Sequence, residues 1–189
     1  MNVKLMPRRK VLLYIAMSLD GRIAKPDGDI RFLETVEQPG EDYGYAAFVA
    51  SIDTVIWGRK TYDKVQTFGT AIPHADKRIF VITRTSRPAT GNITFYSGNL
   101  KKLIAELKDA EGKHIYIDGG AELVSALLKE ELIDELYISI ISVVLGEGIL
   151  LFKDGLPEMP LKLLSAKTFE KGLTQLHYEV VRTNEDSNA

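Results

Sequence analysis

The 189-residue sequence contains no cysteine, which excludes a disulfide framework, a thiol nucleophile and a thiolate metal site. Its three histidines, His74, His114 and His177, lie far apart without metal-ligand spacing, so we expect structural or surface roles for them and no bound metal. The net charge is only −2, and the basic residues are scattered rather than clustered. Neither nucleic acid nor an anionic lipid surface is therefore an expected partner.

The sequence also lacks an apolar run long enough to span a bilayer. Residues 7–19 imitate a secretory signal, because the short basic segment Arg8-Arg9-Lys10 precedes an apolar stretch. However, Asp20-Gly21-Arg22 follow at once, and there is no convincing small-residue cleavage site. A buried strand explains this stretch better, and we expect the protein to be cytoplasmic.

What is present is an ordinary globular composition, with 45% hydrophobic and 26% charged residues. The length fits one domain, since domains commonly have roughly 100–200 residues. We expect a single domain over residues 1–189, with its core at about 11–182 and a polar tail at 184–189. A chain of this length can bury a full core without disulfides or metals.

Strand-like and helix-like segments alternate through the first 140 residues. This alternation predicts crossover units and a largely parallel sheet. The last two strands flank Glu170-Lys171-Gly172 and predict an antiparallel hairpin. The expected strands are 11–16, 54–57, 78–83, 94–96, 114–117, 135–142, 161–169 and 173–182, and the expected helices are 42–51, 61–65, 100–107 and 123–128.

Two strand-to-helix turns contain glycine, which lets a ligand approach the backbone. The first turn is Gly58-Arg59-Lys60-Thr61. Its Arg59 offers a planar fork suited to a phosphate monoester, and Thr61 can donate hydrogen bonds. The second turn contains Gly119-Gly120. Taken alone, the first turn is better explained as a helix start whose cations face water. Taken alone, the second turn is better explained as one that closes a strand. Together they predict a dinucleotide, whose phosphates would meet N–H groups at helix N-termini.

Polar residues also follow the third strand. Ligands of crossover sheets bind beyond the carboxyl ends of the strands, so Thr83 and Arg84 would lie near Arg59 if their strands are neighbours. A solvated strand end explains them about as well. Ala16, at the end of the first strand, is small either because a flat ring packs against it or because a neighbouring side chain does.

Two carboxylates could take part in a reaction. Asp42 shares a helical face with Tyr45 and Val49, and an inward carboxyl in an apolar setting has a raised pKa and can donate a proton. The alternative is a first-turn acid that satisfies helix N–H groups. Asp118 ends a buried strand, where polar residues are uncommon without a task. That task is either a hydrogen bond to a substrate or capping of the next helix.

These segments, in this order, resemble the dihydrofolate reductase superfamily. Within it they resemble the reductase domain of the bifunctional riboflavin-biosynthesis deaminase–reductase and its stand-alone relatives. The resemblance runs from about Val11 to Arg182 and rests on IAMSLDGRIA at 15–24, GRKTY at 58–62, TRT at 83–85 and the paired glycines. It implies a three-layer α/β/α fold with a mixed eight-stranded sheet, four main helices and a C-terminal antiparallel hairpin.

The resemblance implies NADPH as the cofactor, because two arginines would meet its extra phosphate. The nicotinamide end would contact the first strand and the loop after it, and the pyrophosphate would face the paired glycines. The implied cofactor-binding residues are Ala16, Ile23, Gly58, Arg59, Lys60, Thr61, Thr83, Arg84, Gly119 and Gly120.

The substrate half matches the riboflavin-type branch only in part. An acid before the paired glycines, as Asp118 is here, resembles that branch, whereas dihydrofolate reductases carry an apolar residue there. The Asp-Pro-x-Leu-Thr-x-Arg-like segment of that branch has no match in residues 64–77. Matching Asp42 to the pterin-binding carboxylate of dihydrofolate reductases needs a two-residue shift relative to Phe48. The implied catalytic residues are Asp42 and Asp118, and the implied substrate-binding residues are Asp20 and Phe48.

We therefore expect an NADPH-dependent reductase that transfers a hydride to a flat C=N or C=O substrate, such as 5-amino-6-(5-phosphoribosylamino)uracil. The alternatives are a dihydrofolate or pterin reductase and a non-catalytic nucleotide-binding or ligand-sensing domain. A different doubly wound oxidoreductase is disfavoured because no G-x-G-x-x-G follows any strand. The run 138–145 predicts either a homodimer interface or a central strand, and the loop 25–40 is the expected lid over the substrate.

Overall fold

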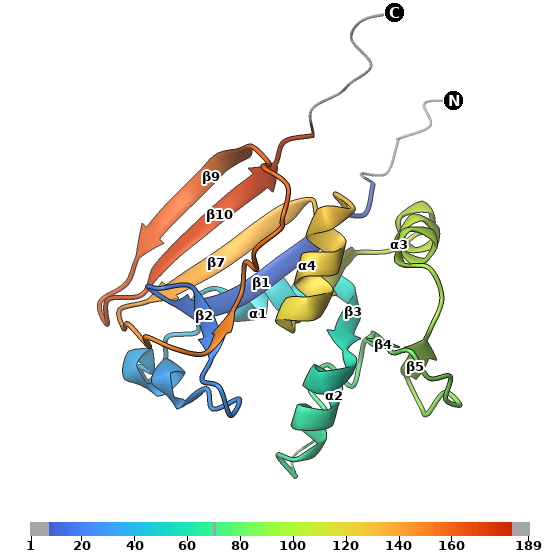
Figure 1. The fold of residues 1–189 in the computed structure, drawn as a ribbon, viewed down its shortest axis with the longest axis horizontal. Helices are drawn as coiled ribbons and strands as arrows, with labels where there is room; N and C mark the ends of the chain where they lie inside the picture. Colours follow the sequence, from blue (N-terminus) through green and yellow to red (C-terminus); the bar gives the residue numbers. More distant parts are fainter. Residues whose placement is uncertain (1–7, 70, 183–189) are drawn as a thin grey trace, which may run out of the picture.

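The structure, a computed structural model, describes residues 8–69 and 71–182. Its centre is an eight-stranded sheet with the strand order β5-β4-β3-β6-β1-β7-β10-β9 (Figure 1). The strands from β5 to β7 run parallel, while β10 is antiparallel to both β7 and β9. The strands of this sheet are β1 (Val11–Ser18), β3 (Ile52–Gly58), β4 (Arg78–Ile82), β5 (Ile93–Tyr96), β6 (His114–Ile117), β7 (Glu135–Ile141), β9 (Leu161–Thr168) and β10 (Thr174–Val180).

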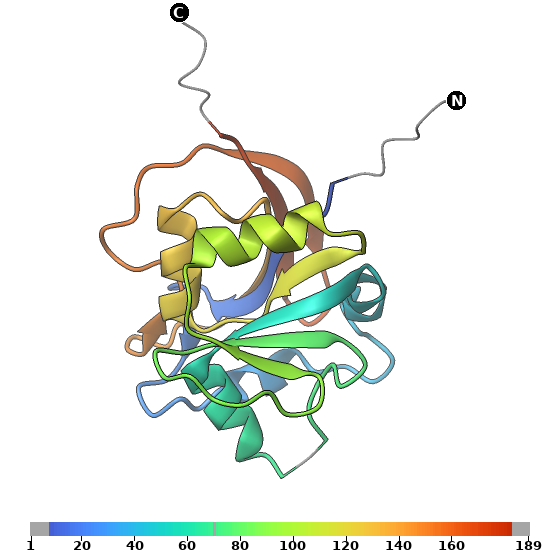
Figure 2. The same ribbon diagram turned by 90° about the vertical axis from the view of Figure 1, so that its right-hand side faces the viewer.

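Helices cover both faces of the sheet (Figure 2). One face packs against α3 (Leu100–Asp109) and α4 (Ala121–Lys129), and the other packs against α1 (Tyr45–Ala50) and α2 (Arg59–Gln66). Two short strands, β2 (Arg22–Ala24) and β8 (Ile149–Leu150), form a separate antiparallel pair. Within residues 8–69 and 71–182, no helix has the length and apolar character needed to cross a membrane.

The mixed sheet, its flanking helices and the C-terminal antiparallel hairpin confirm the fold that the sequence predicts. One helix starts later than expected, because α1 begins at Tyr45 rather than at residue 42. Tyr43 and Gly44 have φ angles of 57° and 82°, a left-handed backbone that cannot continue a right-handed helix. A 3₁₀ helix over Arg31–Val36 and the β2–β8 pair were not predicted, because such short elements show no periodicity.

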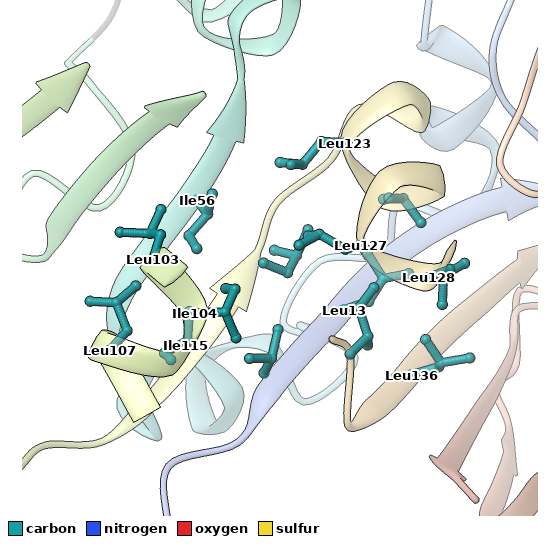
Figure 3. Packing of buried hydrophobic residues seen from close by; sticks show 14 of the residues in the cluster. Leu13, Ile56, Leu103, Ile104, Leu107, Ile115, Leu123, Leu127, Leu128 and Leu136 are labelled. Atoms are coloured by element: carbon teal, nitrogen blue, oxygen red, sulfur yellow. The ribbon is translucent and has the colours of Figure 1, made fainter. Parts of the chain in front are cut away.

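The larger core lies between the sheet and the α3–α4 layer (Figure 3). Leu103 and Leu107 of α3 and Leu127 of α4 are at most 3% exposed and pack toward Leu13 of β1 and Ile56 of β3. Truncating one such leucine to alanine removes apolar contacts and leaves a cavity, at a cost of about 2–5 kcal/mol. This core fixes α4 against the sheet and therefore fixes the turn that precedes α4.

The smaller core, on the other face, is largely aromatic. Phe48 of α1 is 7% exposed, and its ring centroid lies 4.6 Å from that of Tyr14, 4.9 Å from that of Tyr116 and 5.6 Å from that of Tyr137. These rings lie on the side of the sheet where β1, β6 and β7 are neighbours. Tyr116, which lies two residues before Asp118, is thereby packed among aromatic rings.

The strand order brings three functional segments of the sequence together. In the sheet register, Ile117 of β6 lies opposite Leu13 of β1 and Ile56 of β3. Because all three strands are parallel, the residues that follow them leave the sheet at one edge. The GRKTY turn, the paired glycines and the end of β1 therefore meet, although the sequence separates them widely.

Candidate active site

A cleft of about 1730 Å³ opens at the carboxyl ends of the parallel strands. Segments that line it come from the ends of β1, β3, β4 and β6, from the starts of α2 and α4, and from the β2–β8 pair. Every residue that the sequence assigns to the cofactor lies in its wall: Ala16, Ile23, Gly58, Arg59, Lys60, Thr61, Thr83, Arg84, Gly119 and Gly120.

The two glycine turns form one continuous backbone surface. The Gly58 N–H donates a hydrogen bond of 3.1 Å to the Gly119 carbonyl oxygen. A Cβ atom added at Gly120 would lie only 3.2 Å from Thr61 Oγ1, so the turns pack closely enough to favour glycine there. Gly119 has φ +87°, a left-handed backbone that side chains disfavour. The pair of turns thus presents bare backbone to the cleft.

Both turns lead directly into helices whose N-cap residues carry no side chain. Gly58 precedes α2 and Gly120 precedes α4, and neither helix has a side-chain cap hydrogen bond. The first N–H groups of a helix have no partner within the helix and carry the positive end of its dipole. Two such ends beside each other favour an anion with two phosphates, as the sequence predicts for a dinucleotide.

Cationic side chains surround these helix starts. A hydrogen bond from Lys153, together with the charges of Lys60 and Arg84, holds the pKa of Glu122 below its ordinary value. These cations therefore act on the same place, at the first turn of α4. Arg59 is fixed by an ion pair with Asp63 across one helical turn, at 2.7 Å. Its guanidinium is 31% exposed and lines the cleft, where it can meet a phosphate.

Asp118 lies where the cofactor turns meet the aromatic layer. Tyr116 donates a hydrogen bond of 2.6 Å to its Oδ1, and Trp57 Nε1 donates one of 2.8 Å to its Oδ2. The side chain is 30% exposed, and it lines the cleft beside Gly119. Burial raises the pKa of Asp118, although these hydrogen bonds act against the rise. A fixed carboxyl with a raised pKa at the cleft wall has the properties of a proton donor.

Of the two interpretations of Asp42, the inward carboxyl is wrong. Its carboxylate is exposed, does not line the cleft and accepts hydrogen bonds from the N–H groups of Gly44 and Ala46, at 2.8 and 3.0 Å. These bonds lower the pKa of Asp42, which is the opposite of what a proton donor needs. The alternative reading, an acid that satisfies N–H groups where a helix starts, is the one the geometry supports.

The two residues expected to bind substrate also lie outside the wall of the cleft. Asp20 is occupied by a hydrogen bond from Ser18, by the N–H groups of Leu145 and Gly146 and by an ion pair with Arg22. It therefore ties the β1–β2 turn to the loop after β7. Phe48 is buried in the aromatic layer. Its ring contacts those of Tyr14 and Tyr116, which line the cleft, but Phe48 itself does not line it.

The loop that the sequence assigns to a lid reaches the cleft with part of its length, through Pro26, Asp27, Gly28, Ile30 and Leu33. Asp29 anchors this loop, because its carboxylate pairs with Arg31 at 2.7 Å and its backbone carbonyl accepts from the Lys25 N–H. These contacts within the loop fix its shape, and its five residues in the lining lie at the cleft. Its closure over a substrate stays a prediction.

Sequence reasoning missed one residue at the site. His74, expected to be structural or at the surface, lies with its Nε2 4.0 Å from Asp118 Oδ2 and 3.1 Å from the Tyr45 hydroxyl. Its backbone φ of +59° is uncommon for a residue other than glycine. No local pattern around His74 could have revealed this, because the loop between α2 and β4 has no regular structure. Among the described residues, no group of three metal-binding side chains is present.

The sheet and its covering helices have the dihydrofolate reductase-like fold. Dihydrofolate reductase from Enterococcus faecalis covers 92% of this chain with a TM-score of 0.63 at 17% identity. Residues 9–175 match the family model described as the RibD C-terminal domain. The chain belongs to this RibD C-terminal domain family.

Relatives and solved structures are similar to this chain over most of its length. YwjB, an uncharacterized protein of Bacillus subtilis (strain 168), is 44% identical over 171 residues, which are 90% of this chain and 97% of YwjB. The crystal structure of a putative riboflavin biosynthesis protein from Shewanella sp. PV-4 has a TM-score of 0.84 at 30% identity and covers 92% of this chain. A deaminase/5-amino-6-(5-phosphoribosylamino)uracil reductase from Thermotoga maritima has a TM-score of 0.68 at 14% identity, and the match spans 57% of that longer chain.

Proposed function

We propose that this protein is an NADPH-dependent reductase of the riboflavin-biosynthesis type. The observation that carries the proposal is the convergence of ten separately predicted residues on one cleft, around two adjacent glycine turns. Family membership supports a reductase, because the RibD C-terminal domain and its solved relatives are connected with riboflavin biosynthesis. We place the reaction in the cytoplasm and expect a homodimer.

The described residues suit NADPH in chemistry and in shape. The bare backbone at Gly58 and Gly119-Gly120 accommodates a pyrophosphate, and Arg59 and Arg84 offer guanidinium groups to the additional phosphate of NADPH. Ala16 leaves room in the wall for the flat nicotinamide. When bound, NADPH supplies a hydride, and the protein orients it and excludes water.

The substrate of the proposed reaction is a flat heterocycle with a C=N or C=O bond, such as 5-amino-6-(5-phosphoribosylamino)uracil. Asp118 is the residue that we assign to catalysis, because it is the fixed carboxyl in the cleft wall beside the paired glycines. It would give a proton to the heteroatom of the reduced bond. The dihydrofolate or pterin alternative loses support, because Asp42, its matching carboxylate, lies outside the cleft.

The first experiment titrates the protein with NADPH and with NADH while following fluorescence quenching of Trp57, the single tryptophan of the chain. Trp57 is fully buried directly before Gly58, so bound nucleotide should change its emission. We expect tighter binding of NADPH, and a loss of about tenfold or more for Arg84→Gln, since a hydrogen bond to a charged group contributes about 1.5–3 kcal/mol.

Arg87→Gln is the matched control, because Arg87 stands over the Phe95 ring and does not line the cleft. It should bind NADPH as the unmodified protein does. Failure to bind either nucleotide would contradict the proposed cofactor. Binding of NADPH without turnover of any flavin or folate precursor would favour the ligand-sensing alternative.

Asp118→Asn tests the catalytic assignment separately. Its amide keeps the shape of the carboxyl but cannot donate an acidic proton, so we expect turnover to fall by roughly 10²–10⁴-fold with NADPH binding retained. Since the pKa of Asp118 is raised and the protonated form is the donor, the rate should fall as pH rises through that pKa. Full activity of the variant would remove Asp118 from the mechanism.

A further inference from the structure

His74 is built into the site from outside the sequence motifs. Its side chain is 7% exposed and lies between Tyr45 of α1 and Tyr116 of β6. The ring of Tyr116 meets the imidazole edge-on, with centroids 5.8 Å apart and planes at 89°. The Tyr45 hydroxyl and His74 Nε2 are hydrogen-bond partners at 3.1 Å. The imidazole is therefore fixed in one orientation rather than free in a surface loop.

The backbone supports the same conclusion. His74 has a φ of +59°, in the left-handed region, and its carbonyl oxygen accepts from the Lys77 N–H at 2.9 Å. Left-handed residues other than glycine cost free energy and persist only where the surrounding structure holds them, often at functional sites. The turn that imposes this conformation directs the imidazole toward Asp118 Oδ2, at 4.0 Å from Nε2.

We propose that His74 is a positioning residue of the reductase site. Its imidazole, held by Tyr45, sets the charge state of Asp118 and thereby decides at which pH that carboxyl can give up a proton. This inference rests on the proposed function for its catalytic meaning. The electrostatic coupling between His74 and Asp118 itself requires neither cofactor nor substrate.

The reaction explains why such a coupling is useful. In the proposed step, a hydride adds to the substrate carbon, the electron pair of the double bond moves to the heteroatom, and Asp118 transfers its proton to that atom. The carboxylate that remains must be stabilised and then protonated again from solvent. A buried carboxyl alone resists ionisation, whereas an imidazolium 4.0 Å away favours the carboxylate.

The other ionisable groups around His74 keep their charge state while Asp118 titrates. Burial raises the pKa of Tyr45 to about 12 and that of Tyr116 well above its ordinary value, so both stay neutral. Burial likewise raises the pKa of Tyr14, whose ring centroid lies 5.4 Å from that of Tyr45. Asp76, in the same loop, has its pKa lowered mainly by Lys77 and stays ionised. Among these groups, Asp118 is the carboxyl whose pKa is raised by burial, and His74 Nε2 lies 4.0 Å from its Oδ2.

The chain contains its own reporter for this pair. Trp57 Nε1–H donates to Asp118 Oδ2 at 2.8 Å, and Trp57 is the single tryptophan, so one indole N–H resonance reports on the carboxyl. The experiment follows this resonance by ¹H–¹⁵N NMR from about pH 4 to 9 in the full chain without ligands. In the unmodified protein this resonance should shift in an acid step as Asp118 ionises.

His74→Gln removes the cation but keeps a hydrogen-bonding side chain. We expect the midpoint of the acid step to rise by about one pH unit, because an opposite charge at this distance lowers a carboxyl midpoint by about one unit or more. Asp118→Asn should abolish the acid step. His114→Gln is the matched control, since His114 lies at the opposite end of β6, and its curve should equal that of the unmodified protein.

An unchanged acid step in His74→Gln would overturn the proposal. If His74→Gln does not fold, Tyr45→Phe serves instead, because it removes only the hydroxyl that holds the imidazole; it should raise the midpoint by a smaller amount, and an unchanged curve would again overturn the proposal. If the protein binds NADPH and reduces a substrate, His74→Gln should also move the falling limb of the pH–rate profile to higher pH. A failure to bind NADPH contradicts the proposed function alone, since the titration contains no nucleotide.

Discussion

The two ends of the parallel strands use charge in opposite ways. At the amino ends, charged side chains are matched within the protein. Arg9 pairs with Asp53, Lys10 pairs with Glu135 at 2.5 Å, and Asp134 pairs with Lys108 at 2.7 Å. A hollow of about 310 Å³ is present there too, but each cation in its wall forms an ion pair with an acidic residue of the protein.

At the carboxyl ends, in the part of the chain that the structure describes, Lys60, Lys64 and Arg84 line the large cleft and form no ion pair. The neighbouring backbone is bare because it is glycine, and two helices start there without side-chain caps. Charged groups that pair with each other therefore belong to the structural end of the sheet. Charged groups that face a cleft without a partner belong to the end that receives a ligand.

The largest expected effect concerns the matched edge. Arg9 is 3% exposed, and its guanidinium also donates to the Leu107 carbonyl at 3.0 Å and to Thr54 Oγ1 at 2.8 Å. Arg9→Met leaves Asp53 and these acceptors without their partner, so we expect a loss of about 3 kcal/mol in the free energy of unfolding, measured with urea.

Arg8→Met is the control for Arg9→Met. Arg8 pairs with Asp109 at 3.5 Å, but both side chains are more than 70% exposed, so its removal should change stability by less than about 1 kcal/mol. Neither variant should alter NADPH affinity of the folded protein. Equal stability of the two variants would contradict the structural role given to the amino edge.

A smaller effect on stability is expected from adding a methyl group at Gly119, in the glycine turn before α4. Gly119→Ala and Gly40→Ala both place alanine at a left-handed φ, +87° and +84°, and should each cost about 1–2 kcal/mol of stability. Only Gly119 lines the cleft, so only its variant should weaken NADPH binding, by about tenfold or more. Equal NADPH affinities of the two variants in the Trp57 titration would show that the glycine turn does not hold the cofactor.

The smallest expected effect concerns Asp20, which follows the carboxyl end of β1 and should contribute to stability but not to NADPH binding. The hydrogen bond from Ser18, followed by those from the N–H groups of Leu145 and Gly146, lowers the pKa of Asp20 from 3.8 to about 2. Because the folded state favours the ionised carboxylate, its contribution to stability is complete above about pH 4 and is lost as pH falls through about 2.

Asp20→Asn should therefore lower Tm modestly at pH 7, and the difference from the unmodified protein should shrink in scans below about pH 4. NADPH affinity should stay the same, because Asp20 lies outside the wall of the cleft. A large loss of affinity with unchanged Tm would return Asp20 to the ligand site and weaken the comparison between the two edges.

The residues predicted for the cofactor lie together in the cleft wall, whereas Asp42, Asp20 and Phe48 do not line it, and the reason is physical. Glycine turns after apolar strands are local features, since close backbone approach and a left-handed φ are properties of single residues. A carboxylate such as Asp42 is different, because its direction depends on where the helix starts. The left-handed pair Tyr43-Gly44 delays α1 to Tyr45 and leaves Asp42 outside the cleft as a cap.

The sequence by itself determined the strands, the helices, the bare glycine turns and the cations near them, because apolar periodicity and backbone freedom act over a few residues. Only the tertiary structure decided that β3, β6 and β1 are neighbours and that Asp118, rather than Asp42, faces the cleft. It alone brought His74 to Asp118, since the loop and the strand that carry them are far apart in the chain and meet only when α1 and β6 pack together.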